Sequence, residues 1–499
     1  MKKYLIMAVA VFAVLAVAMP SFALEMKYGG MFRIRLQSND NVVDGNDEMD
    51  DNANYIDQRL HMYFTFVSSE NLQVVTKWEA DTRWGADNNG STNFSQGANG
   101  RQGGGDVGAD AVNLEMKNVY IDFAIPMTPV RMTMGVQTLN LLSGWVVADD
   151  FSAAVATAKL DPIRVQLGYI AARNEDFTNE STDNVDDVLL NVSYAQGPFK
   201  ASVVGLYQFG HDTNVGIDPG IIGNATNIQS NTTRGAGHTF PGTTEEVFDN
   251  NFFDLGLSFE YKVPLWSAYI NFVKNFGSFD FGDDDDDNDV ETNYDGWMVD
   301  GGGSFYCGPF TFSLNGFVTS GASINDDERG DSFDDYTHDL NNLFRMPAGV
   351  SHYWSEIMGL GSLDESVANN LGSSGNIVSN NDRNKQNRGY ASADHPANLW
   401  MVSAGAAWQA LEGTKLTFNY YYIGTVEDVL ADNETVGITE DNRRDNSVGH
   451  EFDFYVDQKI VDKLSIRLVG AYLFADDAYT QFAEDDDAYE VGAVLLWAF

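Results

Sequence analysis

The sequence of 499 residues contains a single cysteine, Cys307. One cysteine cannot form a disulfide within its own chain, so other interactions must stabilise the fold. Proline is also scarce, with 11 residues, whereas glycine (47 residues) and aromatic residues (13%) are abundant. This composition suits many strands joined by turns better than packed helices. We expect Cys307 to be a small buried residue beside a turn, without a chemical role.

Basic residues are few, since 29 lysines and arginines face 73 acidic residues and the formal net charge is −44. Such a charge argues against nucleic acid and against other anionic surfaces as partners. The sequence has no G-x-S-x-G, H-E-x-x-H or P-loop motif, no C-x-x-C-H haem motif and no calcium-loop pattern. It therefore predicts neither an enzyme nor a protein with a bound metal or cofactor.

Long apolar runs are missing everywhere except at the beginning of the sequence. Lys2 and Lys3 precede an apolar run of 16 residues, Tyr4–Met19, which the small residues of Pro20–Ala23 follow. This pattern predicts a signal peptide over 1–23, cleaved after Ala23. A membrane anchor helix is the alternative, but the run is short for a span. No later segment offers about 18 consecutive apolar residues, the length that a transmembrane helix needs.

From residue 24 onward, apolar and polar residues alternate with a period of two. Phe32, Ile34 and Leu36 alternate with polar neighbours, and the same pattern recurs in "QRLHMYFTF", "TKLTFNYYY" and "EFDFYVDQ". A helix would place apolar residues three and four positions apart instead. The alternation therefore predicts an all-β protein.

Short and long connections alternate between the predicted strands. Turn residues mark eight short connections, near 69, 127, 161, 197, 264, 308, 412 and 462. Most connections between them are long and polar, among them 85–112, 211–252 and 321–396, whereas 140–144 is short. Eight short turns and nine opposite connections predict 18 strands, with 16 as the alternative. Short periplasmic turns, long extracellular loops and an even strand number are typical of an outer-membrane barrel. We therefore predict one transmembrane antiparallel β-barrel over 24–499.

A secreted β-sandwich or propeller is the alternative fold. In those folds the apolar face points inward, whereas here one face of the strands combines arginine, lysine, histidine and acids. An apolar exterior around a charged interior is what lipid outside and water inside would select. Aromatic residues beside the short turns predict an interfacial girdle. They are Phe123, Tyr194, Phe199, Tyr261, Trp266, Tyr306, Phe310, Trp408 and Trp497.

The polar face supplies the candidate pore-lining charges. They are Arg33, Arg35, Arg59, Lys77, Glu79, Asp81, Arg83, Arg131, Arg164, Glu451, Asp453, Asp457 and Arg467. Closure of the barrel would bring several of these arginines together as a basic patch that sets ion preference. Alternatively, each arginine neutralises a neighbouring carboxylate and stiffens the wall. Both interpretations can hold together.

Two features belong to the long connections. Leu343–Gly361 is apolar and aromatic, and we expect it either to narrow the barrel lumen or to pack between outside loops. Asp283–Asp287 is a run of five acids. It predicts solvated loop charge or, alternatively, weak divalent-cation binding that bridges to lipopolysaccharide.

The signal peptide, the 18-strand pattern and the terminal "LLWAF" together resemble the Gram-negative porin families. Gly449–Tyr479 is similar to the last strands of porin-like and alginate-export-like barrels. The resemblance implies a Gram-negative outer-membrane location, lipid and lipopolysaccharide as neighbours, and an assembly machinery that recognises Trp497 and Phe499. It also implies passive diffusion of small solutes and ions.

Three alternative functions stay open at this point. One is a substrate-specific barrel such as an alginate exporter, although the excess of acids argues against polyanion export. Another is a sugar porin, which would imply a homotrimer and an aromatic slide that could include Tyr63, Tyr421 and Tyr455. The last is a non-conducting sheath or scaffold for a separate partner such as a cytochrome. A general or weakly selective diffusion porin is the preferred prediction.

Overall fold

The computed structural model describes residues 24–42, 53–85, 112, 114–173, 185–210, 248–281, 290–321, 342–346, 352–359, 361–363, 396–430, 444–476, 478–479 and 487–499. The predicted signal peptide over 1–23 and the acidic run Asp283–Asp287 lie outside these residues. So do most of the connections 85–112, 211–252 and 321–396.

The described residues form nineteen strands and one short 3-10 helix, η1 (Leu142–Gly144). The strands are β1 (Glu25–Asp40), β2 (Ala53–Ser69), β3 (Leu72–Arg83), β4 (Glu115–Ala124), β5 (Val130–Leu141), β6 (Val147–Leu160), β7 (Ile163–Arg173), β8 (Val185–Gln196), β9 (Phe199–Gly210), β10 (Phe248–Lys262), β11 (Trp266–Phe281), β12 (Val290–Asn293), β13 (Trp297–Cys307), β14 (Phe310–Thr319), β15 (Leu399–Leu411), β16 (Thr414–Leu430), β17 (Arg444–Val461), β18 (Leu464–Ala475) and β19 (Ala488–Ala498). Among the described residues, no helix is both long and apolar enough to cross a membrane.

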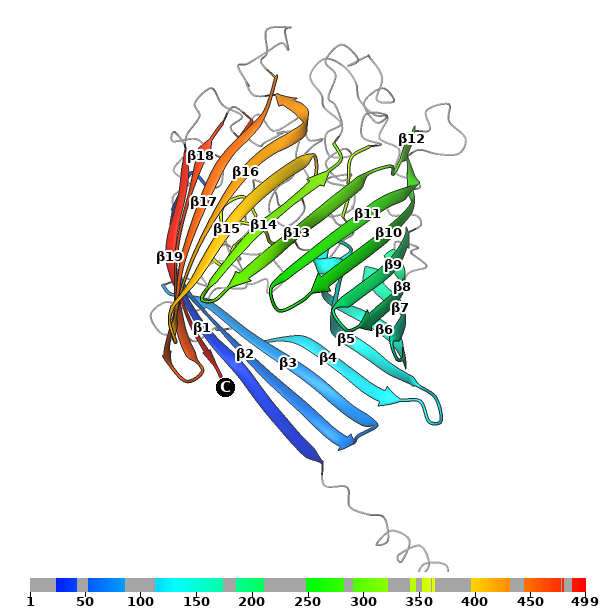
Figure 1. Cartoon of the computed structure of the whole chain (residues 1–499). Coiled ribbons are helices and arrows are strands. Elements are labelled where there is room, and N and C mark those ends of the chain that lie inside the picture. Colours follow the sequence, from blue (N-terminus) through cyan, green and yellow to red (C-terminus); the bar gives the residue numbers. More distant parts are fainter. Residues whose placement is uncertain are drawn as a thin grey trace, which may run out of the picture.

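The strands form one closed antiparallel sheet (Figure 1). Each strand pairs with its neighbour in the sequence, and β12 and β13 pair with successive parts of β11, so the barrel has 18 strand positions. β1 also pairs with β19, from Met31 opposite Ala498 to Asp40 opposite Tyr489. Phe499 continues this ladder by exchanging two backbone hydrogen bonds with Gly30. The predicted all-β barrel of 18 strands is confirmed.

The two faces of the sheet differ as the alternation predicted. Leu314, Phe454 and Leu468 point outward and keep about half of their surface exposed (63%, 48% and 46%). On the opposite face, Asp254 and Glu451 are completely buried inside the barrel. Apolar side chains exposed around the whole circumference suit a lipid surface, because each backbone polar group is paired within the sheet. The barrel is therefore built to span a membrane.

All eight predicted short turns join strands at one end of the barrel, which we call the short-turn rim. Aromatic rings follow this rim, with Tyr261 5.1 Å from Trp266 and Phe310 stacked 6.1 Å from Trp408 between ring centroids. Tyr306 is an exception to the predicted girdle, because its hydroxyl lies 2.9 Å from that of Ser267 on the inner face. The prediction that Cys307 is buried is also wrong, since it is exposed at a turn.

Candidate functional site in the barrel lumen

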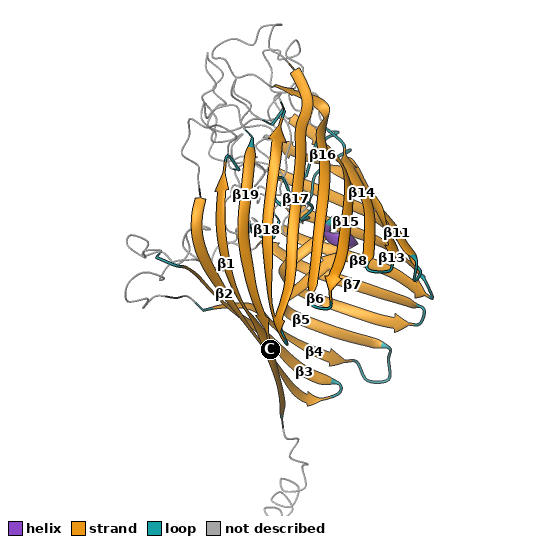
Figure 2. Ribbon diagram, turned by 60° about the vertical axis from the view of Figure 1, so that its left-hand side comes forward, coloured by secondary structure: helices purple, strands orange, loops and turns teal. Residues whose placement is uncertain are grey.

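Two connections from the opposite rim fold into the lumen. The first is the short connection that contains η1, shown in purple within the barrel in Figure 2. Its Trp145 and Val146 are completely buried, and Trp145 Nε1 donates a 3.0 Å hydrogen bond to Asp300 Oδ2 on β13. Asp300 also accepts a 2.8 Å hydrogen bond from Asn271 Nδ2 on β11. A connection between β5 and β6 therefore reaches the wall at β11 and β13.

The second connection supplies residues 342–346, 352–359 and 361–363, which we call the inserted loop. At its beginning, Arg345 N donates a 2.9 Å hydrogen bond to Asn275 Oδ1 on β11. Asn275 Nδ2 donates in turn to Arg345 O (3.0 Å) and to Asp254 Oδ1 on β10 (2.6 Å). Phe344 N donates to Ser320 O at 3.0 Å. These bonds hold the beginning of the loop against the wall at β10 and β11.

The middle of the inserted loop meets the first connection. The His352 ring stacks on Trp145 with 3.9 Å between ring centroids, and His352 Nδ1 lies 3.2 Å from Ser143 O. Phe317 from β14 contacts the edges of both rings. Burial among these rings lowers the pKa of His352, although the negative charge of Asp300 and the Ser143 carbonyl oppose this effect.

The next part of the inserted loop is held by carboxylates of β17. Glu451 accepts hydrogen bonds from Ser355 Oγ (2.9 Å), Ile357 N (2.8 Å) and Met358 N (3.1 Å). Asp453 Oδ2 accepts a 3.2 Å bond from Glu356 N. Glu451 is therefore the main anchor of this part of the loop.

The end of the inserted loop reaches the strands that close the barrel. Ser362 O accepts a 3.4 Å hydrogen bond from Arg35 Nη1 on β1. Leu363 packs among Tyr455, Val469 and Val494, which come from β17, β18 and β19. The loop thus contacts the wall at β11 and also the wall from β17 to β1. Of the two expected positions for Leu343–Gly361, the structure shows the lumen.

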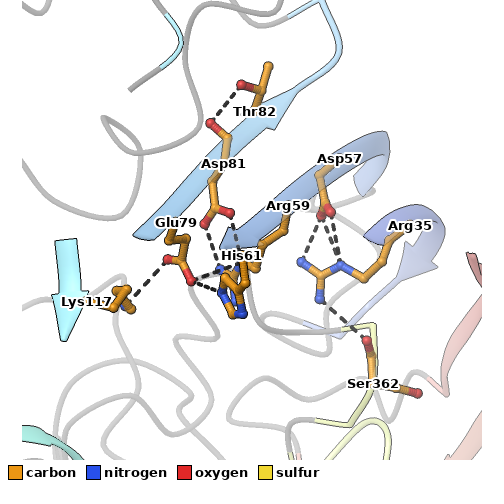
Figure 3. A network of polar contacts seen from close by, with 9 residues as sticks. All are labelled: Arg35, Asp57, Arg59, His61, Glu79, Asp81, Thr82, Lys117 and Ser362. Atoms are coloured by element: carbon orange, nitrogen blue, oxygen red, sulfur yellow. Dashed lines mark hydrogen bonds and ion pairs between the residues drawn. The ribbon is translucent and has the colours of Figure 1, made fainter. Parts of the chain in front are cut away.

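Beside this end of the loop, the inner wall carries a row of ion pairs across β1, β2 and β3 (Figure 3). Arg35 and Asp57 form a buried pair in which Arg35 Nη2 lies 2.8 Å from Asp57 Oδ2. Arg59 donates two hydrogen bonds to Asp81, of 2.8 and 2.7 Å. Neutral and compact pairs of this kind hold neighbouring strands together.

A further acid, Glu79, collects several basic partners in the same row. His61 Nε2 contacts Glu79 Oε2, and Lys117 Nζ lies 3.5 Å from Glu79 Oε1 (Figure 3). Arg59 Nε is 3.7 Å from the same carboxylate. His61, Arg59 and Lys117 therefore share Glu79 as a partner on the inner wall.

The remaining predicted charges lie partly on the same strands, β1 and β3, and partly elsewhere along the barrel. Arg467 donates to Asp457 from Nε at 2.7 Å, and Arg131 pairs with Asp122. The Arg83 guanidinium lies 4.0 Å from the centre of the Tyr55 ring. The other three predicted basic residues are Arg33, opposite Arg59 in the β1–β2 ladder, the half-buried Lys77 and the exposed Arg164.

Arg35, Arg59, Arg131 and Arg467 thus each pair with a carboxylate, as the alternative to a basic patch expected. Sequence reasoning missed their partners Asp57 and Asp122, although Asp57 shares the parity of Arg59. It also missed Asp300, whose role depends on Trp145 from a distant connection. Among the described residues, no cluster of histidine, cysteine and acidic side chains is arranged to hold a metal ion.

Comparisons with known proteins bear on the fold. No family model and no curated protein matches the sequence. The solved structures that this chain resembles include two from Pseudomonas aeruginosa. The outer membrane protein OprD has a TM-score of 0.51 and 9% identity, covering 96% of this chain and 95% of that chain. OpdL has a TM-score of 0.50 and 10% identity, covering 95% of this chain and 99% of that chain. The chain therefore shares the barrel fold of OprD and OpdL, as its resemblance to the porin families implied.

Proposed function

We propose that this protein is a porin of the Gram-negative outer membrane, through which small hydrophilic solutes and ions diffuse passively. One observation carries the proposal: an apolar outer face surrounds a lumen lined by charged and polar side chains. Water must fill such an interior, because isolated charges are too costly to bury in apolar surroundings. Lipid, lipopolysaccharide and the outer-membrane assembly machinery are the proposed partners, with Trp497 and Phe499 as the assembly signal.

The inserted loop supports a pore that selects solutes by size rather than a wide pore. It contacts the inner wall at β11 and at β17, so solutes have to pass beside it. Arg35, Arg59 and Arg467 are each paired with an acid, which leaves little excess of either charge at these three positions of the wall. We therefore propose weak ion selectivity and a limit set mainly by solute size.

Planar-bilayer recording of the refolded mature chain tests this function. A porin is expected to give stable, discrete current steps, with a reversal potential in a salt gradient that lies close to zero. A chain that folds to the barrel but stays silent would instead be a sealed scaffold or sheath. A folding control is needed, and the shift in gel mobility on heating of a stable barrel provides it.

A further inference from the structure

A cavity of about 470 Å³ lies between the inserted loop and the inner wall of β16, β17 and β18. Cavities of some 300–1,000 Å³ are the usual size of small-molecule sites. Its wall residues, among them Lys415 and Asp457, lie close to the turn between β16 and β15 and the turn after β17, so the cavity belongs to the short-turn half of the lumen. The contacts described above for the lumen leave this space open.

One side of the cavity is aromatic. Tyr353 and Trp354 of the inserted loop line it, and Tyr353 keeps 55% of its surface exposed. Trp354 makes edge-to-face contacts with Phe317 and Tyr421, at 5.2 and 6.5 Å between ring centroids. These contacts fix the orientation of the indole ring. A fixed aromatic ring at the edge of a wet cavity offers an apolar surface for the face of a flat solute.

Polar groups without charge also line the cavity. Thr417 and Asn419 of β16 line it together with Ser355 and Ser362 of the inserted loop. Thr417 Oγ1 is buried and has no hydrogen-bond partner among the described residues. A buried hydroxyl without a partner is costly, and a bound solute would remove that cost once the Thr417 side chain turns its shielded hydroxyl toward the cavity.

The charged groups of the cavity balance one another. Arg467 is committed to Asp457 through two hydrogen bonds, of 2.7 and 3.3 Å. Lys415 lies opposite Asp457 in the β16–β17 ladder. Glu356 is held within the loop by Ser362 Oγ at 2.7 Å. Two cations and two acids line the cavity, so it has no net charge to attract an ionic solute.

We propose that this cavity is a binding subsite for a neutral saccharide of one or two rings. The face of a pyranose ring is apolar and fits an aromatic side chain, and its edge carries hydroxyls that both donate and accept hydrogen bonds. The cavity combines these two surfaces, with paired charges that also bond hydroxyls. This proposal rests on the proposed function, because a porin brings solutes to the site, and it deepens that function by naming a solute class.

Calorimetric titration of the folded barrel in detergent tests the subsite without requiring an open channel. The probes are glucose, maltose, the linear polyol sorbitol and the anion glucuronate. We expect saturable, weak binding of glucose or maltose and clearly weaker binding of sorbitol, which has no ring face. Tighter binding of glucuronate than of glucose would overturn the neutral assignment, and binding of none of the four would overturn the subsite.

Two variants locate the binding. Thr417→Val removes one hydroxyl at nearly constant volume and should weaken glucose or maltose about fivefold, since a hydrogen bond contributes roughly 1 kcal/mol. Trp354→Leu should weaken it further. Thr311→Val on β14, which lies outside the cavity lining, is the matched control and should bind as the parent does. Equal affinity of the parent and both cavity variants would place the saccharide elsewhere and refute the proposal.

Bilayer recording separates this proposal from the proposed function. A conducting chain that binds no saccharide keeps the porin and loses the subsite. A silent chain that binds maltose in detergent loses the porin and keeps the subsite. In a conducting chain that binds maltose, added maltose should reduce the current in a saturable way, and Thr417→Val should shift that reduction to higher concentration.

Discussion

His352 joins two connections that are far apart in the sequence. Its ring stacks on Trp145, and its Nδ1 contacts Ser143 O across 209 positions of the chain. The groups that face it from the packed elements are Asp300 on β13, the Ser143 carbonyl and the rings of Trp145 and Phe317. His352 therefore keeps its contacts with Trp145 and Ser143 only while the inserted loop lies in the lumen.

This arrangement predicts a response to acid. Burial lowers the pKa of His352 in the docked loop, so an undocked loop takes up the proton first as pH falls. The docked state is therefore fully stable above the ordinary histidine pKa of about 6.5 and loses stability as pH falls below it. We expect larger or noisier currents near pH 5 than near pH 8 in bilayer recordings. His352→Phe keeps the ring stack and should remove this difference, and an unchanged pH response in His352→Phe would contradict the prediction.

At the scale of elements, the contact between β1 and β2 is stabilised by a side-chain ion pair as well as by backbone hydrogen bonds. Arg35 and Asp57 face each other across β1 and β2, with side chains only 1% and 5% exposed. Arg35 also reaches the inserted loop at Ser362 O. The strands that close the barrel and the end of the inserted loop therefore share one buried ion pair.

Arg35→Ala should be strongly destabilising, because it leaves the Asp57 carboxylate buried without its partner. We expect a loss of about 3–5 kcal/mol in the free energy of unfolding, measured by guanidinium titration in detergent with tryptophan fluorescence. The double variant Arg35→Leu with Asp57→Leu should lose less. Lys200→Ala is the control, because the Lys200–Glu260 pair is exposed and should contribute only about 0–1 kcal/mol. Similar losses for Arg35→Ala and Lys200→Ala would refute the role of burial.

Strands and turns are also the features that the sequence predicts best. A period of two and turn residues such as Gly197–Pro198 are local signals, and they are enough to place all eight short turns and to count the 18 strand positions. One boundary is wrong, since the predicted connection 211–252 overlaps the start of β10 at Phe248. The sequence did not predict that Glu451 and Asp300 bind the two connections in the lumen. Their partners lie in segments where apolar and polar residues do not alternate. Tertiary contacts alone bring those residues together.

For the whole molecule, the inserted loop contacts the wall at β11, β17 and β1 and would set the width of the proposed passage. It is attached to the wall at β10 and β11 by Asn275, to β17 by Glu451 and to β1 by Arg35. The barrel closes through its own backbone ladder without these contacts. The width of the passage can therefore change while the barrel stays intact.

Glu451→Gln should release the loop and increase the conductance. Ile357 N and Met358 N bond different oxygens of Glu451, so the NH2 of the new amide would face one of these two donors, and such a mismatch costs about 1–3 kcal/mol. We expect larger or more frequently fluctuating current steps at unchanged barrel stability. Glu260→Gln, near the short-turn rim, is the matched control and should conduct as the parent does. Identical step sizes and fluctuations for Glu451→Gln and the parent would show that Glu451 does not hold the loop.

The pairing of Met31 with Ala498 has a consequence for the order of folding events. These residues lie near opposite ends of the sequence, so their contact has the largest chain separation in the sheet and the greatest loop-closure cost. The hairpins between consecutive strands can form as synthesis proceeds, whereas this last ladder has to wait for the final residues. Until then the growing sheet has two open edges that could pair with other chains. We expect the proposed outer-membrane assembly machinery to shield β1 until β19 arrives.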